Sequence, residues 1–221
     1  MNRKITFSTF VLAFLLIASF TTKAQDPNRF KSSIKELSEK EYNFNPDKKL
    51  IVFTGSSSIY KWKDVADYFP DYNVVNFGFG GSHYSDLIYW YDKLITRFQP
   101  DYLFIYEGDN DIAAKKKPGK VYKQAKGLIK RVKSDLPKTE IIIISAKPSI
   151  ARWNLSKGYK KLNKKLNKFC DRQDHVAFAN VWDIMLDKNG NVMQDIFIED
   201  GLHMNAKGYN LWKKELDKYL K

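Results

Sequence analysis

Residues 50–59 read Leu-Ile-Val-Phe-Thr-Gly-Ser-Ser-Ser-Ile, a continuous apolar run followed at once by glycine and small polar residues. Continuous apolar runs of this length are typical of strands in a parallel sheet, because such strands are buried on both faces. The segment therefore predicts a buried strand that ends in a polar turn.

Similar apolar runs recur along the chain. They are Val74-Val75, Tyr102–Tyr106, Ile141–Ile144 and Val176–Phe178. Segments with helical spacing separate or follow these runs, at roughly residues 84–98, 121–136, 159–171 and 206–219. Strands that alternate with helices are typical of parallel βαβ units. We therefore predict an α/β fold, a three-layer α/β/α sandwich with a five-stranded parallel sheet.

Length and composition indicate one globular domain. The 221 residues are 43% hydrophobic and 29% charged, with a net charge of +13. Most of the lysines fall in helical patterns such as residues 157–168, where they would form a solvated face. No segment resembles a nucleic-acid-binding motif, so we expect no nucleic-acid partner. The single cysteine, Cys170, cannot form an intramolecular disulfide and has no obvious base beside it.

The N-terminal residues are typical of a secretory signal peptide. Arg3 and Lys4 precede a largely apolar run from Ile5 to Phe20, and the small residues Thr22 and Ala24 suit cleavage before Gln25. We therefore predict a signal peptide at residues 1–24, a single domain at residues 25–221, and an exported protein, periplasmic or secreted. A transmembrane anchor is the alternative. Its apolar run is short for a span of about 20 residues, so we expect no stable membrane insertion after cleavage.

Small and polar residues follow each of the first four predicted strands. They lie at residues 54–59, 76–82, 107–111 and 147–149. Because ligands bind beyond the carboxyl ends of parallel strands, these residues should gather at one edge of the sheet. This convergence indicates an enzyme or a small-ligand site.

A serine nucleophile requires a base, usually a histidine that is oriented by a carboxylate. The chain has three histidines, His83, His175 and His203. His175 lies in a charged segment, and His83 has no carboxylate at a useful local spacing. His203 follows Asp200 by three residues. If this loop turns into the final helix, the two side chains can lie on one face and form a hydrogen bond.

Four blocks together resemble the SGNH (GDSL-like) hydrolases, serine esterases with a flavodoxin-like sheet. The blocks are Gly-Ser-Ser-Ser-Ile from Gly55, Gly-Phe-Gly-Gly-Ser from Gly78, Gly-Asp-Asn-Asp from Gly108, and Asp-Gly-Leu-His from Asp200. The residues of these blocks are similar to those of a subgroup of SGNH hydrolases that bacteria export. The resemblance implies that Ser57 is the nucleophile and that Asp200 and His203 complete the catalytic triad. It also implies that the Gly81 backbone N–H and the Asn110 side-chain amide donate to the oxyanion.

The sequence departs from this family at one position. Family members usually carry aspartate before the nucleophile, whereas this chain has Ser56. Because residues 56–58 are all serine, Ser58 remains an alternative nucleophile. The missing aspartate is expected to alter hydrogen bonding in the loop more than the chemistry, since Asp200 supplies the triad acid.

Several other residues have two readings. Asp109 and Asp111 form an acidic cluster, but further ligands are absent nearby in the sequence, so we predict no metal; we predict no cofactor either. Trp62, Trp90 and Trp153 either belong to the core or line a sugar-binding cleft. Lys147 and Arg152 either contact an anionic substrate or lie in solvent at the edge of the sheet.

These observations predict an exported serine esterase that hydrolyses short-chain carboxylic esters through an acyl-enzyme. The resemblance and the export signal favour O-acetyl groups on carbohydrate or cell-wall glycan, so the expected partner is a small-molecule or glycan ester. One alternative is a lysophospholipase-like lipid acylhydrolase. The other is a glycan-binding protein that retains the fold without turnover.

Overall fold

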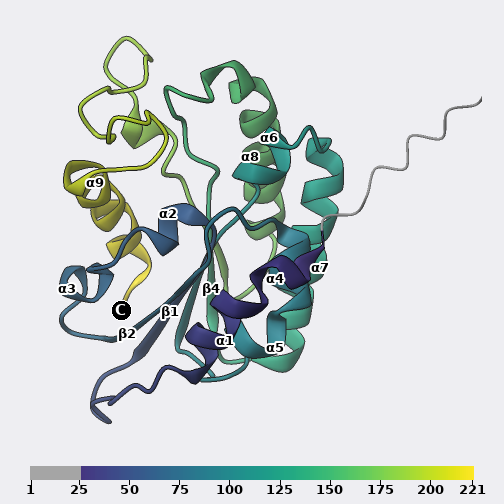
Figure 1. Cartoon of the computed structure of the whole chain (residues 1–221), viewed down its shortest axis with the longest axis vertical. Coiled ribbons are helices and arrows are strands. Elements are labelled where there is room, and N and C mark those ends of the chain that lie inside the picture. The colour runs from purple at the N-terminus through teal and green to yellow at the C-terminus, as the bar shows by residue number, and fades with distance from the viewer. Residues whose placement is uncertain (1–25) are drawn as a thin grey trace, which may run out of the picture.

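The computed structural model describes residues 26–221 and contains a five-stranded parallel sheet (Figure 1). The strands are β1 (Leu50–Gly55), β2 (Asn73–Gly78), β3 (Tyr102–Tyr106), β4 (Glu140–Ile144) and β5 (Val176–Ala179). Their order in the sheet is β2-β1-β3-β4-β5, and every neighbouring pair is parallel. The predicted α/β fold is therefore confirmed. The predicted signal peptide, residues 1–24, lies outside the described residues.

Alternate residues of each strand enter two separate cores, one on each face of the sheet. In β4, Ile141 and Ile143 pack into one core, and Ile142 and Ile144 pack into the other. All four of these side chains are at most 1% exposed. Because both faces are covered, the strands need no alternation of apolar and polar residues, and continuous apolar runs result.

Helices cover both faces of the sheet (Figure 1). One face carries α1 (Lys31–Glu39), α4 (Tyr84–Tyr89), α5 (Tyr91–Leu94), α7 (Pro118–Asp135) and α8 (Ser156–Cys170). The other face carries α2 (Ser57–Tyr60), α3 (Val65–Tyr68) and α9 (Ala206–Leu216). The short helix α6 (Asp109–Ala113) follows β3, and 3-10 turns lie at Pro27–Phe30, Trp153–Leu155, Asp183–Met185 and Asp217–Tyr219. No helix within residues 26–221 is both long and apolar enough to cross a membrane.

The helices differ from the sequence prediction in two respects. The helix expected at residues 84–98 is divided into α4 and α5, because Trp90 leaves helical geometry and its indole N–H donates to the Pro27 carbonyl at 3.1 Å. Helices α1, α2, α3 and α6 were not predicted. The helices α2, α3 and α6 have only four or five residues each, and the nine residues of α1 include just two apolar side chains, Ile34 and Leu37.

The carboxyl ends of the strands meet at one edge of the sheet, where β1 lies between β2 and β3. This is a topological switch point, the usual place of a ligand site in an open parallel sheet. Gly55 ends β1 with a φ of +126°, and a Cβ atom there would lie 2.0 Å from the Tyr106 carbonyl oxygen. Only glycine fits this close approach. The backbone can therefore turn sharply and start α2 at Ser57.

Candidate active site

Ser57 is the first residue of α2, directly beyond the end of β1. Its hydroxyl oxygen, Oγ, lies 2.9 Å from Nε2 of His203, which is 146 residues away in the sequence. Ser58 lies differently: it is only 2% exposed, and its carbonyl accepts a hydrogen bond from the Tyr209 hydroxyl. The structure therefore brings Ser57, and not Ser58, into contact with His203.

Asp200 holds the other side of the His203 ring. Its Oδ2 lies 2.5 Å from His203 Nδ1, and its Oδ1 accepts the backbone N–H groups of Leu202 and His203 at 2.9 and 2.8 Å. An Nδ1 atom that donates to a carboxylate carries the proton, so Nε2 is free to accept from Ser57. Burial alone would raise the pKa of Asp200, but the hydrogen bonds from His203 and Leu202 outweigh it and hold that pKa at about 2.

Asp200 and His203 lie in a tight loop before α9, not on one face of the helix. The Ile198 N–H donates to the His203 carbonyl at 2.9 Å and closes this loop. Asn205 then begins α9, because its side chain accepts the Gly208 N–H while its amide donates to the Asp195 and Phe197 carbonyls. The Asp200 and His203 side chains are therefore brought together by a turn that ends at the N-cap of α9, and not by the helix itself.

The predicted oxyanion donors lie close to Ser57. A Cβ atom at Gly80 would lie 3.8 Å from the Ser57 Cβ, which places the loop containing Gly81 beside the serine. Gly81 has a φ of +83°, is exposed, and has open space where a side chain would stand. Within residues 26–221, neither the Gly81 N–H nor the Ser57 N–H donates a hydrogen bond to another protein group.

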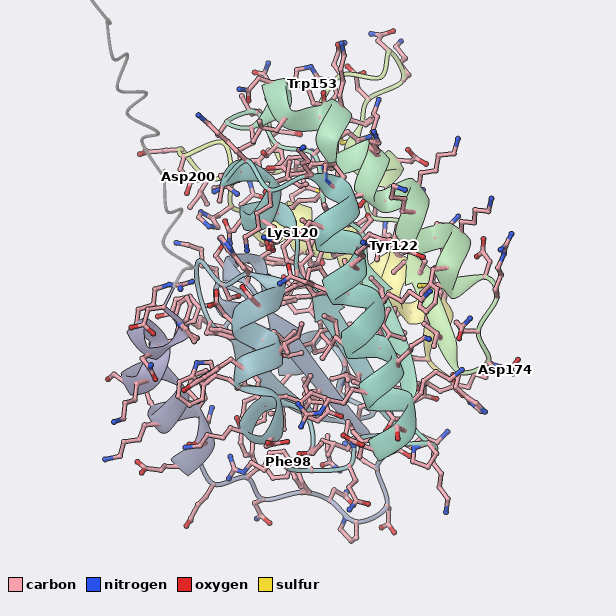
Figure 2. The ribbon with its side chains drawn as sticks, turned by 90° about the vertical axis from the view of Figure 1, so that its right-hand side faces the viewer. Phe98, Lys120, Tyr122, Trp153, Asp174 and Asp200 are labelled. Atoms are coloured by element: carbon pink, nitrogen blue, oxygen red, sulfur yellow. The ribbon has the colours of Figure 1, made fainter. Side chains whose placement is uncertain are left out.

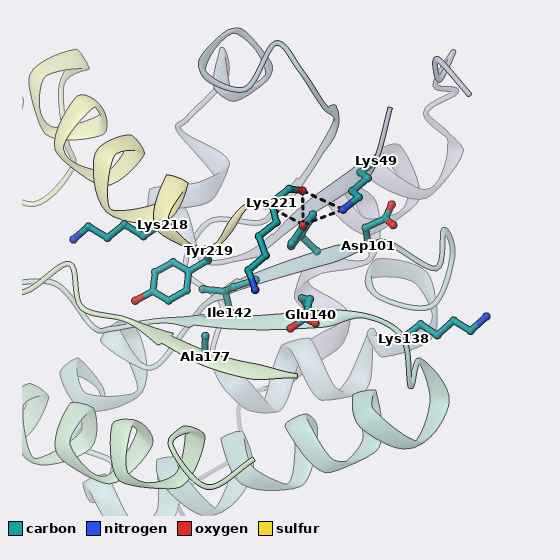
Figure 3. A pocket seen from close by; sticks show the side chains of 10 residues that line it. Lys49, Asp101, Lys138, Glu140, Ile142, Ala177, Lys218, Tyr219 and Lys221 are labelled. Atoms are coloured by element: carbon teal, nitrogen blue, oxygen red, sulfur yellow. Dashed lines mark hydrogen bonds between the residues drawn. The ribbon is translucent and has the colours of Figure 1, made fainter. Parts of the chain in front are cut away.

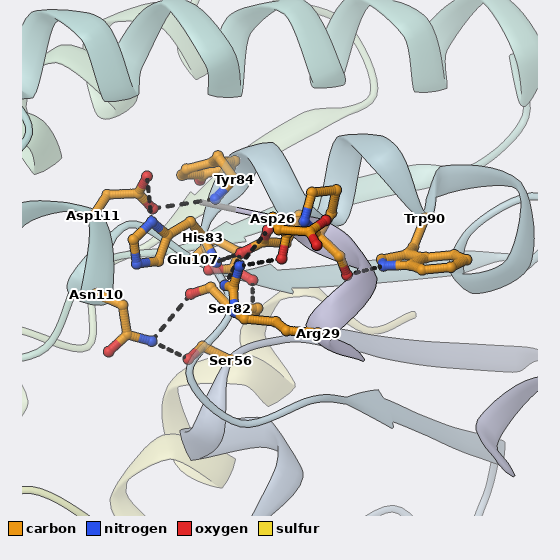
Figure 4. Close-up of polar contacts among 12 residues, drawn as sticks. Asp26, Arg29, Ser56, Ser82, His83, Tyr84, Trp90, Glu107, Asn110 and Asp111 are labelled. Carbon is orange, nitrogen blue, oxygen red and sulfur yellow. Dashed lines mark hydrogen bonds and ion pairs between the residues drawn. The ribbon is translucent and has the colours of Figure 1, made fainter. Parts of the chain in front are cut away.

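The Asn110 side chain lies beside the same loop, and both its amide nitrogen and its carbonyl oxygen form hydrogen bonds with other residues (Figure 4). Its amide nitrogen, Nδ2, donates to the Ser56 hydroxyl at 2.6 Å and to the Ser82 carbonyl at 3.0 Å. Its carbonyl oxygen, Oδ1, accepts from Arg152 at 3.0 Å. An oxyanion would therefore compete with the Ser56 hydroxyl for an amide hydrogen.

Residues 52–211 match the sequence profile of the GDSL-like lipase/acylhydrolase family. The chain belongs to this family. Family membership implies an enzyme that hydrolyses esters, and the blocks that resemble the SGNH hydrolases all fall inside or at the edge of the matched region. The sequence has no significant match among curated proteins.

Solved structures share the family fold. A protein from Streptococcus pneumonia, provisionally named a platelet activating factor, is 22% identical with a TM-score of 0.75, over 88% of this chain and 92% of that one. A GDSL-like lipase from Bacteroides thetaiotaomicron is 16% identical with a TM-score of 0.70, over 87% and 96% of the two chains. An acetylxylan esterase from Geobacillus stearothermophilus is 12% identical with a TM-score of 0.63, over 77% and 93%.

In this GDSL-family chain, Asp109 and Arg152 form an ion pair behind Asn110. Arg152 Nη1 lies 2.7 Å from Asp109 Oδ1, and the Tyr159 hydroxyl donates to the same oxygen at 2.7 Å. Burial raises the pKa of Asp109, but the neighbouring Lys147 and Arg152 charges outweigh it and lower that pKa below its usual value. Both sequence readings of Arg152 omitted this role: its guanidinium orients the Asn110 amide.

Glu107 is a fully buried acid that the sequence analysis placed at this edge without a role. The Ser82 hydroxyl donates to its carboxyl, and burial together with the Asp111 charge raises the pKa of Glu107 far above its usual value. Glu107 therefore holds its proton more tightly than an exposed glutamic acid does. It supports the Ser82 side chain next to Gly81. Its place directly after a buried apolar strand was the available sequence signal.

His83 belongs to a buried polar cluster and does not contact Ser57, unlike His203 (Figure 4). Its Nδ1 lies 2.7 Å from Lys116 Nζ, and Lys116 also pairs with Asp111 at 2.8 Å. Burial lowers the pKa of His83. Because each oxygen of Asp111 is used by Lys116 or the Tyr84 N–H, the acidic cluster of the sequence is satisfied by the protein itself.

Lys147 is also buried, contrary to both sequence readings of it. It is 1% exposed, and its ammonium donates to the Leu202 carbonyl, next to His203, at 2.5 Å. Burial lowers the pKa of Lys147 to about 8, against the opposing effect of Asp109 and Asp200. Lys147 therefore contacts neither solvent nor an incoming ligand, and instead supports the loop that carries Asp200 and His203.

One pocket of about 490 Å³ lies at the opposite edge of the sheet (Figure 3). Lys49, Asp101 and Glu140 line it, at the amino ends of the strands. None of the predicted site residues lines this pocket, so it is separate from the candidate active site.

Proposed function

We propose that this chain is an exported serine esterase that hydrolyses short-chain carboxylic esters, with O-acetyl groups on carbohydrate or cell-wall glycan as substrates. The proposal is carried by one observation, the continuous contact from Ser57 Oγ through His203 to Asp200, at 2.9 and 2.5 Å. Membership of the GDSL-like family supports ester hydrolysis independently.

The reaction begins when Ser57 Oγ attacks the ester carbonyl carbon and its proton moves to His203 Nε2. The carbonyl electron pair becomes an oxyanion. Its collapse breaks the bond to the alcohol oxygen, which takes the proton from Nε2 and leaves. Water then attacks the acyl-enzyme in the same way, giving the carboxylic acid and restoring Ser57.

The oxyanion receives hydrogen bonds from the Ser57 and Gly81 backbone N–H groups and from Asn110. In this proposal, Asn110 exchanges its contact with the neutral Ser56 hydroxyl for one with the charged oxygen. That exchange is favourable, because hydrogen bonds to a charged acceptor are roughly twice as strong as those between neutral groups. Because Ser56 replaces the usual aspartate, a neutral hydroxyl competes with the oxyanion for the Asn110 amide, and a neutral hydroxyl is the weaker acceptor.

Two observations bear on the acyl group. On the oxyanion side, Gly80, Gly81 and Ser82 form the loop beside Ser57 and the Asn110 amide contacts that loop, which supports a short acyl group. Ile150 and Ile198 are 45% and 43% exposed on the loops of the same edge, which favours a lipid acylhydrolase as the second candidate. The acetylxylan esterase among the structural neighbours adds support for acetylated carbohydrate.

A series of nitrophenyl esters with acyl chains of two to twelve carbons tests the proposal on the chain without residues 1–24. We expect the acetyl and propionyl esters to have the highest kcat/KM, falling beyond about four carbons, because each further methylene contributes about 0.8 kcal/mol only where it finds dry surface. An optimum at eight carbons or more would favour the lipid alternative. Absence of turnover on every ester would favour the non-catalytic alternative.

Export is proposed from the N-terminal sequence alone. Intact-mass measurement of protein from the native host should show Gln25 as the first residue. A membrane-bound form that retains Met1 would contradict this.

A further inference from the structure

We propose that a groove beside the triad loop binds the glycan portion of the substrate, an inference that rests on the proposed esterase function. The groove has a volume of about 610 Å³. Ile150 and Trp153, from the loop after β4, form one wall, and Asp187 together with residues 191–194 forms the other.

The groove adjoins the histidine side of the candidate site. The Ala151 N–H donates to the Gly201 carbonyl at 3.0 Å, and a methyl group added at Gly201 would come within 3.2 Å of the Ile150 Cβ. Gly201 lies between Asp200 and His203 in the chain. Trp153 and Asp200 lie toward the same end of the molecule, opposite Phe98 (Figure 2).

This position determines which part of an ester the groove can receive. His203 Nε2 must pass its proton to the departing alcohol oxygen, so the alcohol portion has to approach from the histidine side. The acyl group instead lies toward the oxyanion donors. A ligand that extends into the groove therefore extends from the alcohol portion.

The lining of the groove combines the apolar side chains of Ile150, Val192 and Met193 with an aromatic ring and polar groups, a combination that suits a sugar. Trp153 is 39% exposed, and it is held by a stacked contact with Trp182, with ring centroids 6.0 Å apart and an interplanar angle of 23°. This arrangement presents a fixed, flat apolar surface of the kind that the C–H face of a sugar ring can cover. It also distinguishes Trp153 from Trp62, which is fully buried in the core.

Polar groups stand opposite this surface. Asp187 accepts the Asn189 and Asn191 backbone N–H groups at 2.9 and 2.8 Å, which fixes the turn. The Gln194 side chain is exposed and lines the groove. A hydrocarbon chain in the groove would displace water from the Gln194 amide and leave that amide without a hydrogen bond. Sugar hydroxyls would instead replace the hydrogen bonds that the water made. The expected ligand is therefore an acetylated oligosaccharide.

The first test compares hydrolysis of O-acetylated oligosaccharides of one to four units, built on xylose, glucose or N-acetylglucosamine, with hydrolysis of nitrophenyl acetate. In the wild type, kcat/KM should rise at least about tenfold from one unit to three on at least one backbone. Trp153→Ala should abolish this gain relative to nitrophenyl acetate, and Gln194→Ala should reduce it. Trp153→Phe should recover part of it. Tyr89→Ala, which removes an aromatic ring that is 54% exposed on α4, should leave the gain intact.

The second test measures binding without turnover. Ser57→Ala protein should bind the same acetylated oligosaccharides saturably in calorimetry, and addition of Trp153→Ala should weaken that binding at least about tenfold. Turnover of nitrophenyl acetate with no gain on any oligosaccharide would overturn the groove assignment and leave the esterase. A loss in Trp153→Ala confined to long-chain nitrophenyl esters would also overturn it. Saturable binding with no turnover of any ester would overturn the esterase and leave the groove.

Discussion

The Asp200 carboxylate is 42% exposed, whereas the Asp109 carboxylate, which pairs with Arg152 behind Asn110, is 8% exposed. The two sides of the candidate active site are built differently. The relay side consists of Ser57, His203 and Asp200, joined in a chain by single contacts between side chains. The donor side consists of Asn110 and its partners, where each polar atom of the Asn110 side chain has at least one partner of its own.

This difference separates chemistry from stability. A chain of single contacts fails completely when one member is removed, but it carries little of the folding free energy. A buried network of charged and polar groups holds its geometry strongly, and removal of one member leaves others buried without partners. The relay side should therefore lose activity without stability, and the donor side should lose both.

The largest effect is expected for Ser57→Ala. Because Ser57 Oγ makes one side-chain contact, kcat should fall about 10⁴–10⁶-fold while Tm changes by less than about 2 °C. His203→Ala should act similarly, and the double variant should be little worse than either, since both residues serve one step. Steady-state kinetics with nitrophenyl acetate and calorimetric melting measure both quantities.

Ser58→Ala is the matched control for the relay. Ser58 is 2% exposed, and burial keeps it away from a bound ester. Its removal should lower Tm more than Ser57→Ala does, while kcat stays within about tenfold of wild type. An inactive Ser58→Ala together with an active Ser57→Ala would show that the nucleophile is Ser58.

Part of the relay side was accessible to sequence reasoning, because Asp200 and His203 lie three residues apart, whereas Ser57, 146 residues from His203, was assigned from the resemblance. The spacing from Gly55 to Ser57 follows one strand, and Asp200 and His203 lie in one loop. The donor side was accessible only in part. The role of Asn110 followed from a resemblance, but its partner Arg152 lies 42 residues away and its partner Ser56 lies 54 residues away. Such contacts depend on the strand order and the loops beyond it. For the same reason, the sequence analysis placed Lys147 and Arg152 at an open edge of the sheet, whereas Lys147 is buried and Arg152 is paired with Asp109.

The second effect in size is expected for Asn110→Ala, which tests the donor side. Loss of one oxyanion donor should lower kcat about 10²–10³-fold with little change in KM. The same variant removes the amide that donates to the Ser82 carbonyl and the Ser56 hydroxyl and leaves Arg152 with its Asp109 contact alone, so the free energy of unfolding should fall by about 1–3 kcal/mol. Urea unfolding at pH 7 measures this second loss, which Ser57→Ala should not show.

Asn110→Asp sharpens the result, because it keeps the shape and the oxygen that accepts from Arg152 but removes the N–H donors. Its kcat should fall at least as far as that of the alanine variant, since a carboxylate would also repel the oxyanion. A decrease limited to KM in both variants would make Asn110 a ground-state binding residue and remove it from the oxyanion site.

The smallest effect is expected for Lys147, which joins the two sides: it donates to the Leu202 carbonyl on the relay loop and carries a charge beside Asp109. Burial lowers its pKa from 10.5 to about 8, so the unfolded chain binds this proton more tightly than the folded one. Stability therefore rises as pH increases between these two values.

The gain in the free energy of unfolding from pH 7 to pH 9.5 should be about 2 kcal/mol in the wild type relative to Lys147→Met. Urea unfolding of both proteins at the two pH values measures this gain. Subtracting the change in the free energy of unfolding of Lys147→Met from that of the wild type removes the contribution of every group that titrates in both proteins. Lys120→Met, at an exposed position of α7, should follow the wild type. If Lys147→Met and the wild type instead show the same pH dependence, Lys147 carries its charge in water, and the two sides of the site are not joined through a buried ammonium.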